Sequence, residues 1–136
     1  MYIRESTNDK DIPILVDLVV EAFGSSPNIA RNTILKSNTI LIIYDETDKI
    51  IGFVCYRYLT DKIIFVDYFV IDKNHHNKGI ASLVLDYSVK DLRSKGVEKI
   101  IAFISGVNPK AFNIFSKWGF NAIKFLPNGV IIGVNI

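Results

Sequence analysis

Residues that could bind an anion follow an apolar stretch in the middle of the chain. Residues 63–71, IIFVDYFVI, read as a β-strand, and a polar, basic connector from Asp72 to Lys78 leads from it to Gly79. An apolar pattern with helical spacing begins directly after this glycine. The first amides of a helix have no intrahelical partner, and the helix dipole is positive at that end. The spacing therefore predicts an anion site at a turn between a strand and a helix.

The residue types at this turn fit an anion site. Gly79 lets the main chain approach a phosphate closely, and Ala81 is small enough for the same purpose. His76 and Lys78 add side chains that can donate hydrogen bonds. The alternative is a plain turn glycine before a helix, flanked by solvated side chains.

Asp67 is the acidic residue within the apolar strand. Burial raises the pKa of a carboxyl group toward the range in which it can act as a general base. The alternative is that Asp67 faces solvent or pairs with Arg57 on the preceding strand. Both interpretations remain open from the sequence.

The sequence predicts no metal site. His75 and His76 are adjacent and are the chain's two histidines, whereas zinc takes at least three protein ligands. The single cysteine, Cys55, excludes an internal disulfide and reads as a buried structural thiol.

The elements that must position these residues follow from periodicity and from breaking residues. Apolar alternation predicts strands over 2–5, 39–44, 50–58, 63–71, 99–105, 120–125 and 130–135. Helical spacing, glycines and prolines predict helices over 11–23, 27–36, 80–95 and 109–118. The Asn128-Gly129 pair predicts a hairpin between the last two strands.

The order of these elements is β-α-α-β-β-β-α-β-α-β-β. A strand, helix and strand in series across the central turn require the strands over 63–71 and 99–105 to be parallel. We therefore expect a single α/β domain over residues 1–136. It would have a mixed, mostly antiparallel seven-stranded sheet with two helices on each face.

Composition narrows the partners. The 136 residues are 49% hydrophobic and carry a formal net charge of only +2, which is too little for a basic nucleic-acid-binding surface. No apolar run approaches the roughly 18 residues of a membrane span. The first residues lack the pattern of a signal or transit peptide. These features predict a cytoplasmic protein that binds neither nucleic acid nor a membrane.

Two motifs resemble those of the GNAT superfamily of N-acetyltransferases. His76-Asn77-Lys78-Gly79-Ile80-Ala81 is similar to its central signature, with His76 where the family usually has Gln or Arg. Asn108 through Gly119-Phe120 is similar to its second signature. The resemblance covers nearly the whole chain and has the element order given above. It implies direct transfer of an acetyl group from acetyl-CoA to a primary amine.

The resemblance also implies roles for individual residues. The pyrophosphate of CoA would lie at the amides and side chains of His76, Asn77, Lys78, Gly79, Ile80, Ala81 and Ser82. The pantetheine arm would lie along the strand residues Phe69, Val70 and Ile71, and would hydrogen-bond to Asn108. A bulge in the strand would have to part it from its parallel neighbour beyond Ile71, and backbone amides there could polarise the thioester carbonyl.

Phe115 departs from the family pattern. Many members have a tyrosine at this position that protonates the leaving thiolate, whereas a phenyl ring can only pack against the thioester. Three alternatives follow: water supplies the proton, Tyr68 or Tyr87 supplies it, or the protein is a catalytically silent acyl-CoA-binding sensor or partner module.

The acceptor is expected to be an amine-bearing small molecule or a peptide or protein. Its site would be built from the first two helices and the turn at 126–130. A homodimer through the final strand, 130–136, is predicted as the alternative to a monomer, since an unpaired apolar edge would be available there.

Overall fold

The computed structural model describes residues 1–6, 9–76, 79–106 and 109–136. These residues form seven strands, four α-helices and two short 3₁₀-helices. The strands are β1 (Tyr2–Glu5), β2 (Thr39–Tyr44), β3 (Ile50–Thr60), β4 (Ile63–Ile71), β5 (Lys99–Ser105), β6 (Asn121–Leu126) and β7 (Gly129–Asn135). The helices are η1 (Asp9–Asp11), α1 (Ile12–Phe23), α2 (Pro27–Lys36), η2 (Lys73–His75), α3 (Ile80–Ser94) and α4 (Pro109–Lys117). The predicted order of strands and α-helices is confirmed.

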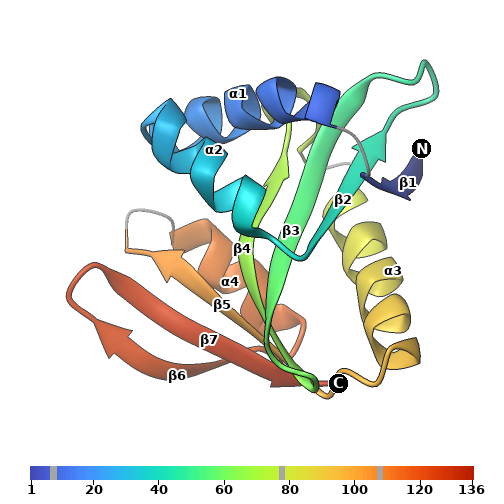
Figure 1. Cartoon of the computed structure of the whole chain (residues 1–136). Coiled ribbons are helices and arrows are strands. Elements are labelled where there is room, and N and C mark those ends of the chain that lie inside the picture. The colour runs from blue at the N-terminus through green and yellow to red at the C-terminus, as the bar shows by residue number, and fades with distance from the viewer. Residues whose placement is uncertain (7–8, 77–78, 107–108) are drawn as a thin grey trace.

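The strands form one sheet in the order β1-β2-β3-β4-β5-β7-β6 (Figure 1). The pair β4–β5 is parallel, with α3 as its crossover, and the other neighbouring pairs are antiparallel. The mixed, mostly antiparallel seven-stranded sheet predicted from the sequence is therefore confirmed.

Two apolar cores lie on opposite faces of the sheet. Under α1 and α2, Leu15, Val19 and Ile34 pack with Phe53 and other side chains of the strands. On the other face, Val84 of α3 and strand residues form the buried core against which α4 packs. Apolar side chains recur at helical spacing in each helix and alternate in the strands, so each helix buries one stripe against one face. The prediction of two helices on each face is confirmed.

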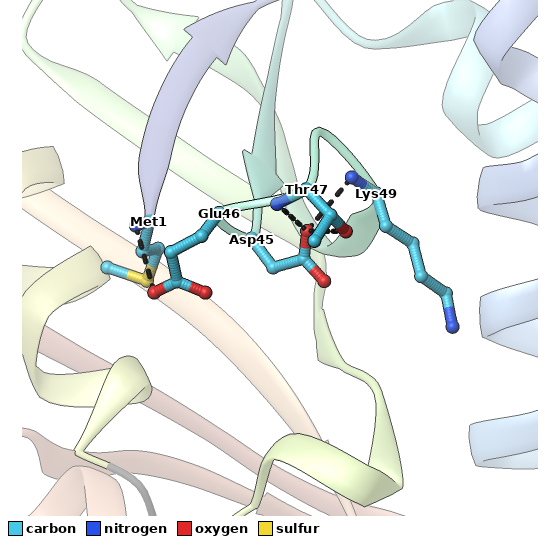
Figure 2. A network of polar contacts seen from close by, with 5 residues as sticks. All are labelled: Met1, Asp45, Glu46, Thr47 and Lys49. Carbon is cyan, nitrogen blue, oxygen red and sulfur yellow. Dashed lines mark hydrogen bonds and ion pairs between the residues drawn. The ribbon is translucent and has the colours of Figure 1, made fainter.

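Asp45 closes the turn between β2 and β3. Its Oδ1 accepts hydrogen bonds from the amide of Thr47 at 2.8 Å, the hydroxyl of Thr47 at 2.8 Å and the amide of Lys49 at 3.0 Å (Figure 2). These donors hold the pKa of Asp45 below its usual value. The N-terminal ammonium of Met1 lies 3.5 Å from Oε1 of Glu46, so the start of β1 contacts the same turn.

The turns before β4 and before β7 differ from the prediction. β3 continues to Thr60, two residues beyond the predicted end, so the turn into β4 consists of Asp61 and Lys62. In the last hairpin Leu126 pairs with Gly129, and the turn residues are Pro127 and Asn128, neither of which has a positive φ. Proline suits the first turn position. Gly129 is instead a strand residue at which a Cβ atom would lie 2.5 Å from Cζ of Phe103.

The predicted dimer edge on the final strand is wrong. β7 lies between β5 and β6 and pairs with both, so it has no unpaired edge. The last hairpin instead places β6 at the border of the sheet.

Candidate functional site

A β-bulge in β4 shapes the candidate site. On β3, the consecutive residues Cys55 and Tyr56 pair with Tyr68 and Val66, so Asp67 is an extra residue in β4. A bulge bends its strand and changes which side chains share a face. The bulge implied by the family resemblance is therefore present, and Asp67 forms it.

The parallel strands separate directly at this bulge. β4 and β5 pair from Ile63 and Lys99 to Val66 and Ala102, and the described residues show no further pair between them. The predicted divergence beyond Ile71 is wrong by several residues, because the bulge bends β4 away already at Asp67. Further along β4, the described residues show no pairing of the backbone with β5, and a ligand could hydrogen-bond to the groups on that side that have no partner.

The divergence opens a cleft of about 730 Å³ between α1, β4, the turn after β4, and β5. It gathers the predicted residues Asp67, Tyr68, Phe69, Val70, Ile71 and His76. It also includes residues that the sequence did not single out: Leu18, Glu21, Ala22, Phe23, Ser25, Asp72, Lys73, Phe103 and Ser105. The acceptor site expected at the first two helices covers the α1 residues, whereas nothing in the sequence pattern marks Phe103.

The N-terminus of α3 has the geometry of an anion site. Gly79 adopts φ 71° and ψ 7° immediately before the helix, and its carbonyl accepts the amide of Leu83 at 3.2 Å. The preceding amides of the first turn have no intrahelical acceptor, and that turn contains no acidic residue. A Cβ on Gly79 would meet no atom within 4 Å, so the space beside it is open. Asn77 and Lys78, predicted for the same site, lie outside the described residues.

His76 connects this turn to the end of β4. Its Nε2 lies 2.7 Å from the carbonyl oxygen of Ile71. A carbonyl oxygen can only accept, so Nε2 carries the proton and donates it. The contact of this side chain with phosphate remains a prediction. Nδ1 is the ring nitrogen that does not bond to the Ile71 carbonyl.

Asp67 combines the two alternatives left open by the sequence. Its side chain is only 10% exposed, and Nε of Arg57 lies 3.3 Å from Oδ1. Burial raises the pKa of Asp67, while the Arg57 guanidinium acts in the opposite direction. Arg57 itself is half exposed and lies over the ring of Phe65, 5.0 Å from its centroid.

Tyr68 follows the bulge and faces the α1 side of the sheet. Its ring stacks on Phe23 with a centroid distance of 6.1 Å and lies 6.3 Å from Phe53. Burial raises the pKa of its hydroxyl, which therefore keeps its proton. Tyr87, the other candidate acid, is exposed on α3 and does not line the cleft.

Phe115 lies in an aromatic cluster on the α3/α4 face. Its ring centroid is 6.1 Å from that of Phe69, 5.5 Å from Trp118 and 5.2 Å from Phe120. No hydroxyl exists at this position, so this part of α4 contributes packing and no proton donor. Asn108, predicted to bind the pantetheine arm, lies outside the described residues.

The remaining sequence predictions concern metals, membranes and the thiol. The described part of the chain has no group of three or more His, Cys, Asp or Glu side chains that could hold a metal ion. Within the same residues, no helix is long and apolar enough to cross a membrane. Cys55 is fully buried and free, as predicted.

Solved structures share this fold over almost the entire chain. Ard1 from Thermoplasma volcanium is 16% identical, with 99% of this chain and 97% of that chain covered and a TM-score of 0.83. A GNAT family acetyltransferase from Elizabethkingia anophelis with acetyl-CoA bound is 15% identical, with coverage of 99% and 97% and a TM-score of 0.83. The ribosomal-protein-S18-alanine N-acetyltransferase from Escherichia coli is 15% identical, with coverage of 99% and 94% and a TM-score of 0.81.

Sequence comparison gives the family. No curated protein matches the chain as a sequence relative. The model of the Acetyltransferase (GNAT) family matches residues 13–120, which include the strand with the bulge and both motifs. The chain therefore belongs to the GNAT family of acetyltransferases.

Proposed function

We propose that this protein transfers the acetyl group of acetyl-CoA directly to a primary amine. The observation that carries the proposal is the cleft at the Asp67 bulge together with the open N-terminus of α3 at Gly79, three residues after His76 of the cleft lining. Its two parts match the two parts of CoA: strand backbone for an amide-containing arm and helix amides for a pyrophosphate. The Elizabethkingia anophelis protein of the same fold, which has acetyl-CoA bound, supports this donor.

In this proposal, three groups of residues hold the donor. The amides from Gly79 through Ile80, Ala81 and Ser82 bind the pyrophosphate, where the helix dipole favours negative charge. Phe69, Val70 and Ile71 lie beyond the last β4–β5 pair and bind the pantetheine arm through their backbone. Asn77, Lys78 and Asn108 complete the proposed set from outside the described residues.

The chemistry of transfer requires a base for the ammonium of the acceptor and a proton for the leaving thiolate. Acetyl-CoA supplies the activated carbonyl when bound. Asp67 accepts the ammonium proton, directly or through water, because burial raises the pKa of its carboxyl. Tyr68 is the candidate acid that lines the cleft, and water is the alternative. Positioning the amine against the carbonyl supplies the larger share of the rate enhancement.

Substitution of Gly79 tests donor binding. Gly79 and Gly96 have φ values of 71° and 84°, and a Cβ at either would meet no atom within 4 Å. Valine therefore strains both ends of α3 by a similar amount, on the order of 1–2 kcal/mol. We expect Gly79→Val to weaken CoA binding at least about 10-fold by calorimetry, which corresponds to about 1.4 kcal/mol. We expect Gly96→Val to leave the affinity unchanged. Equal affinities for the two variants would refute the pyrophosphate assignment.

Turnover separates an enzyme from a binding module. The second candidate function is the catalytically silent acyl-CoA-binding module. It is favoured by Phe115, which has no hydroxyl where many family members have a tyrosine. The assay is thiol release from acetyl-CoA with a panel of primary amines, with the acetylated product identified by mass spectrometry. Product formation would establish transfer. CoA binding without product from any amine would establish the silent module.

A further inference from the structure

The point at which β4 and β5 separate is lined by aromatic rings. Asp67 and Phe103 are the first residues beyond the last pair, Val66 with Ala102, and both line the cleft. Phe23 also lines the cleft, from the end of α1. Phe23 is 45% exposed and Phe103 is 38% exposed, so both rings present apolar surface that no other side chain covers.

Both rings are held in position by packing. Phe23 stacks on Tyr68 with an interplanar angle of 23°. Phe103 lies so close over Gly129 that a Cβ there would be 2.5 Å from its Cζ. A ligand on this wall would therefore meet preorganised aromatic surface, which lowers the entropy cost of binding.

The carboxylates of the cleft differ in what they contact. Glu21 lies 3.0 Å from Nζ of Lys73, which also lines the cleft. Asp72 accepts the amide of Asn74 at 2.9 Å. Asp67 is paired with Arg57, which does not line the cleft. The cleft lining thus contains three carboxylates, of which Asp67 is the one at the point where β4 and β5 separate.

We propose that the acceptor is a primary amine attached to an apolar, preferably aromatic, group. Its ammonium lies toward Asp67 and its apolar body lies between Phe23 and Phe103. A second positive charge on that body would lie against the two rings, because the remaining carboxylates lie elsewhere: Glu21 on α1 beside Lys73, and Asp72 at the turn after β4. Removing such a charge from water without a carboxylate beside it is costly. This inference rests on the proposed acetyl transfer and narrows its acceptor from amines in general to apolar monoamines.

Matched amines test the inference. Hexylamine and 1,6-diaminohexane have the same chain length and differ in the second ammonium group. We expect kcat/KM for hexylamine to exceed that for the diamine by about 10-fold or more, the size of discrimination that an apolar pocket gives. Phenethylamine should be at least as good as hexylamine. Tetrapeptides beginning with Phe or with Asp test whether the N-terminal amine of a peptide binds beside the same two rings. A preference for the Phe peptide would establish a peptide as a source of the acceptor amine.

Substitution of the two rings gives a second readout. Phe103→Ser and Phe23→Ser should each raise KM for hexylamine about 10-fold and leave CoA affinity unchanged. Phe125→Ser is the control, since Phe125 is 76% exposed on β6 and does not line this cleft. Equal or better use of the diamine, or unchanged KM in folded ring variants, would overturn the inference. CoA binding without turnover of any amine would refute the transfer reaction and this inference with it.

Discussion

At Asp67, burial and an ion pair act on the same carboxyl group in opposite directions. Burial raises its pKa, while Arg57 favours the charged form. A raised pKa means that the folded protein holds this proton more tightly than the unfolded chain. The carboxyl therefore costs the folded state free energy as the pH rises from its ordinary value of 3.8 through the raised pKa, and this cost is constant above it.

Replacement of Asp67 by asparagine separates catalysis from stability. With the base removed, we expect kcat at pH 7 to fall about 10²-fold. The deficit should shrink above the pKa of the acceptor amine, because the amine then arrives without its proton. A pH series of initial rates measures this. Thermal unfolding of Asp67→Asn at pH 7 should give a Tm no lower than that of the wild type. A clear drop would show that the Arg57 pair outweighs the cost of burial.

β4 shows what an element's sequence can and cannot predict. Its bounds, 63–71, follow directly from its apolar run, and the structure confirms them. The bulge leaves no trace in the pattern, because both faces of this strand are covered with apolar side chains. Val66 and Phe69 pack on one core, and Tyr68 and Val70 on the other. A one-residue shift in the alternation of side chains along β4 therefore does not show in the sequence. For the same reason, the separation of β4 from β5 was predicted too far along the strand.

Deletion of Asp67 tests whether the bulge opens the cleft. Without Asp67, the remaining residues of this part of β4 still alternate between the two cores, so the fold should survive. These residues are Val66, Tyr68, Phe69, Val70 and Ile71. A straight β4 could then continue to pair with β5 and close the cleft. We expect a cooperative unfolding transition, a wild-type far-UV circular dichroism spectrum and loss of CoA binding by calorimetry. Retained affinity in the folded deletion variant would show that another feature separates the strands.

For the whole molecule, the sequence predicts which strands make up the sheet better than it predicts which strand lies at the edge. The order of elements and the two-sided packing follow from local periodicity. The position of β7 between β5 and β6 depends on which side of the last hairpin meets β5, a long-range choice that the turn residues do not encode. The two rings of the cleft were not predicted for a similar reason, since only the tertiary fold places Phe23 and Phe103 in one cleft lining.

Cys55 reports on the integrity of the half of the molecule that carries α1. Its side chain is fully buried between the sheet and the α1/α2 core, and burial raises the pKa of its thiol to about 12. A thiol that is neither exposed nor ionised does not react, so labelling requires the protein to open. We expect Ellman's reagent to label no cysteine in the native protein at pH 8 and one per chain in guanidinium chloride.

The native protein therefore contributes no thiol of its own to an assay that measures the thiol released from acetyl-CoA. Rapid native labelling would contradict the expectation. It would show that α1, and with it one wall of the cleft, separates from the sheet without global unfolding.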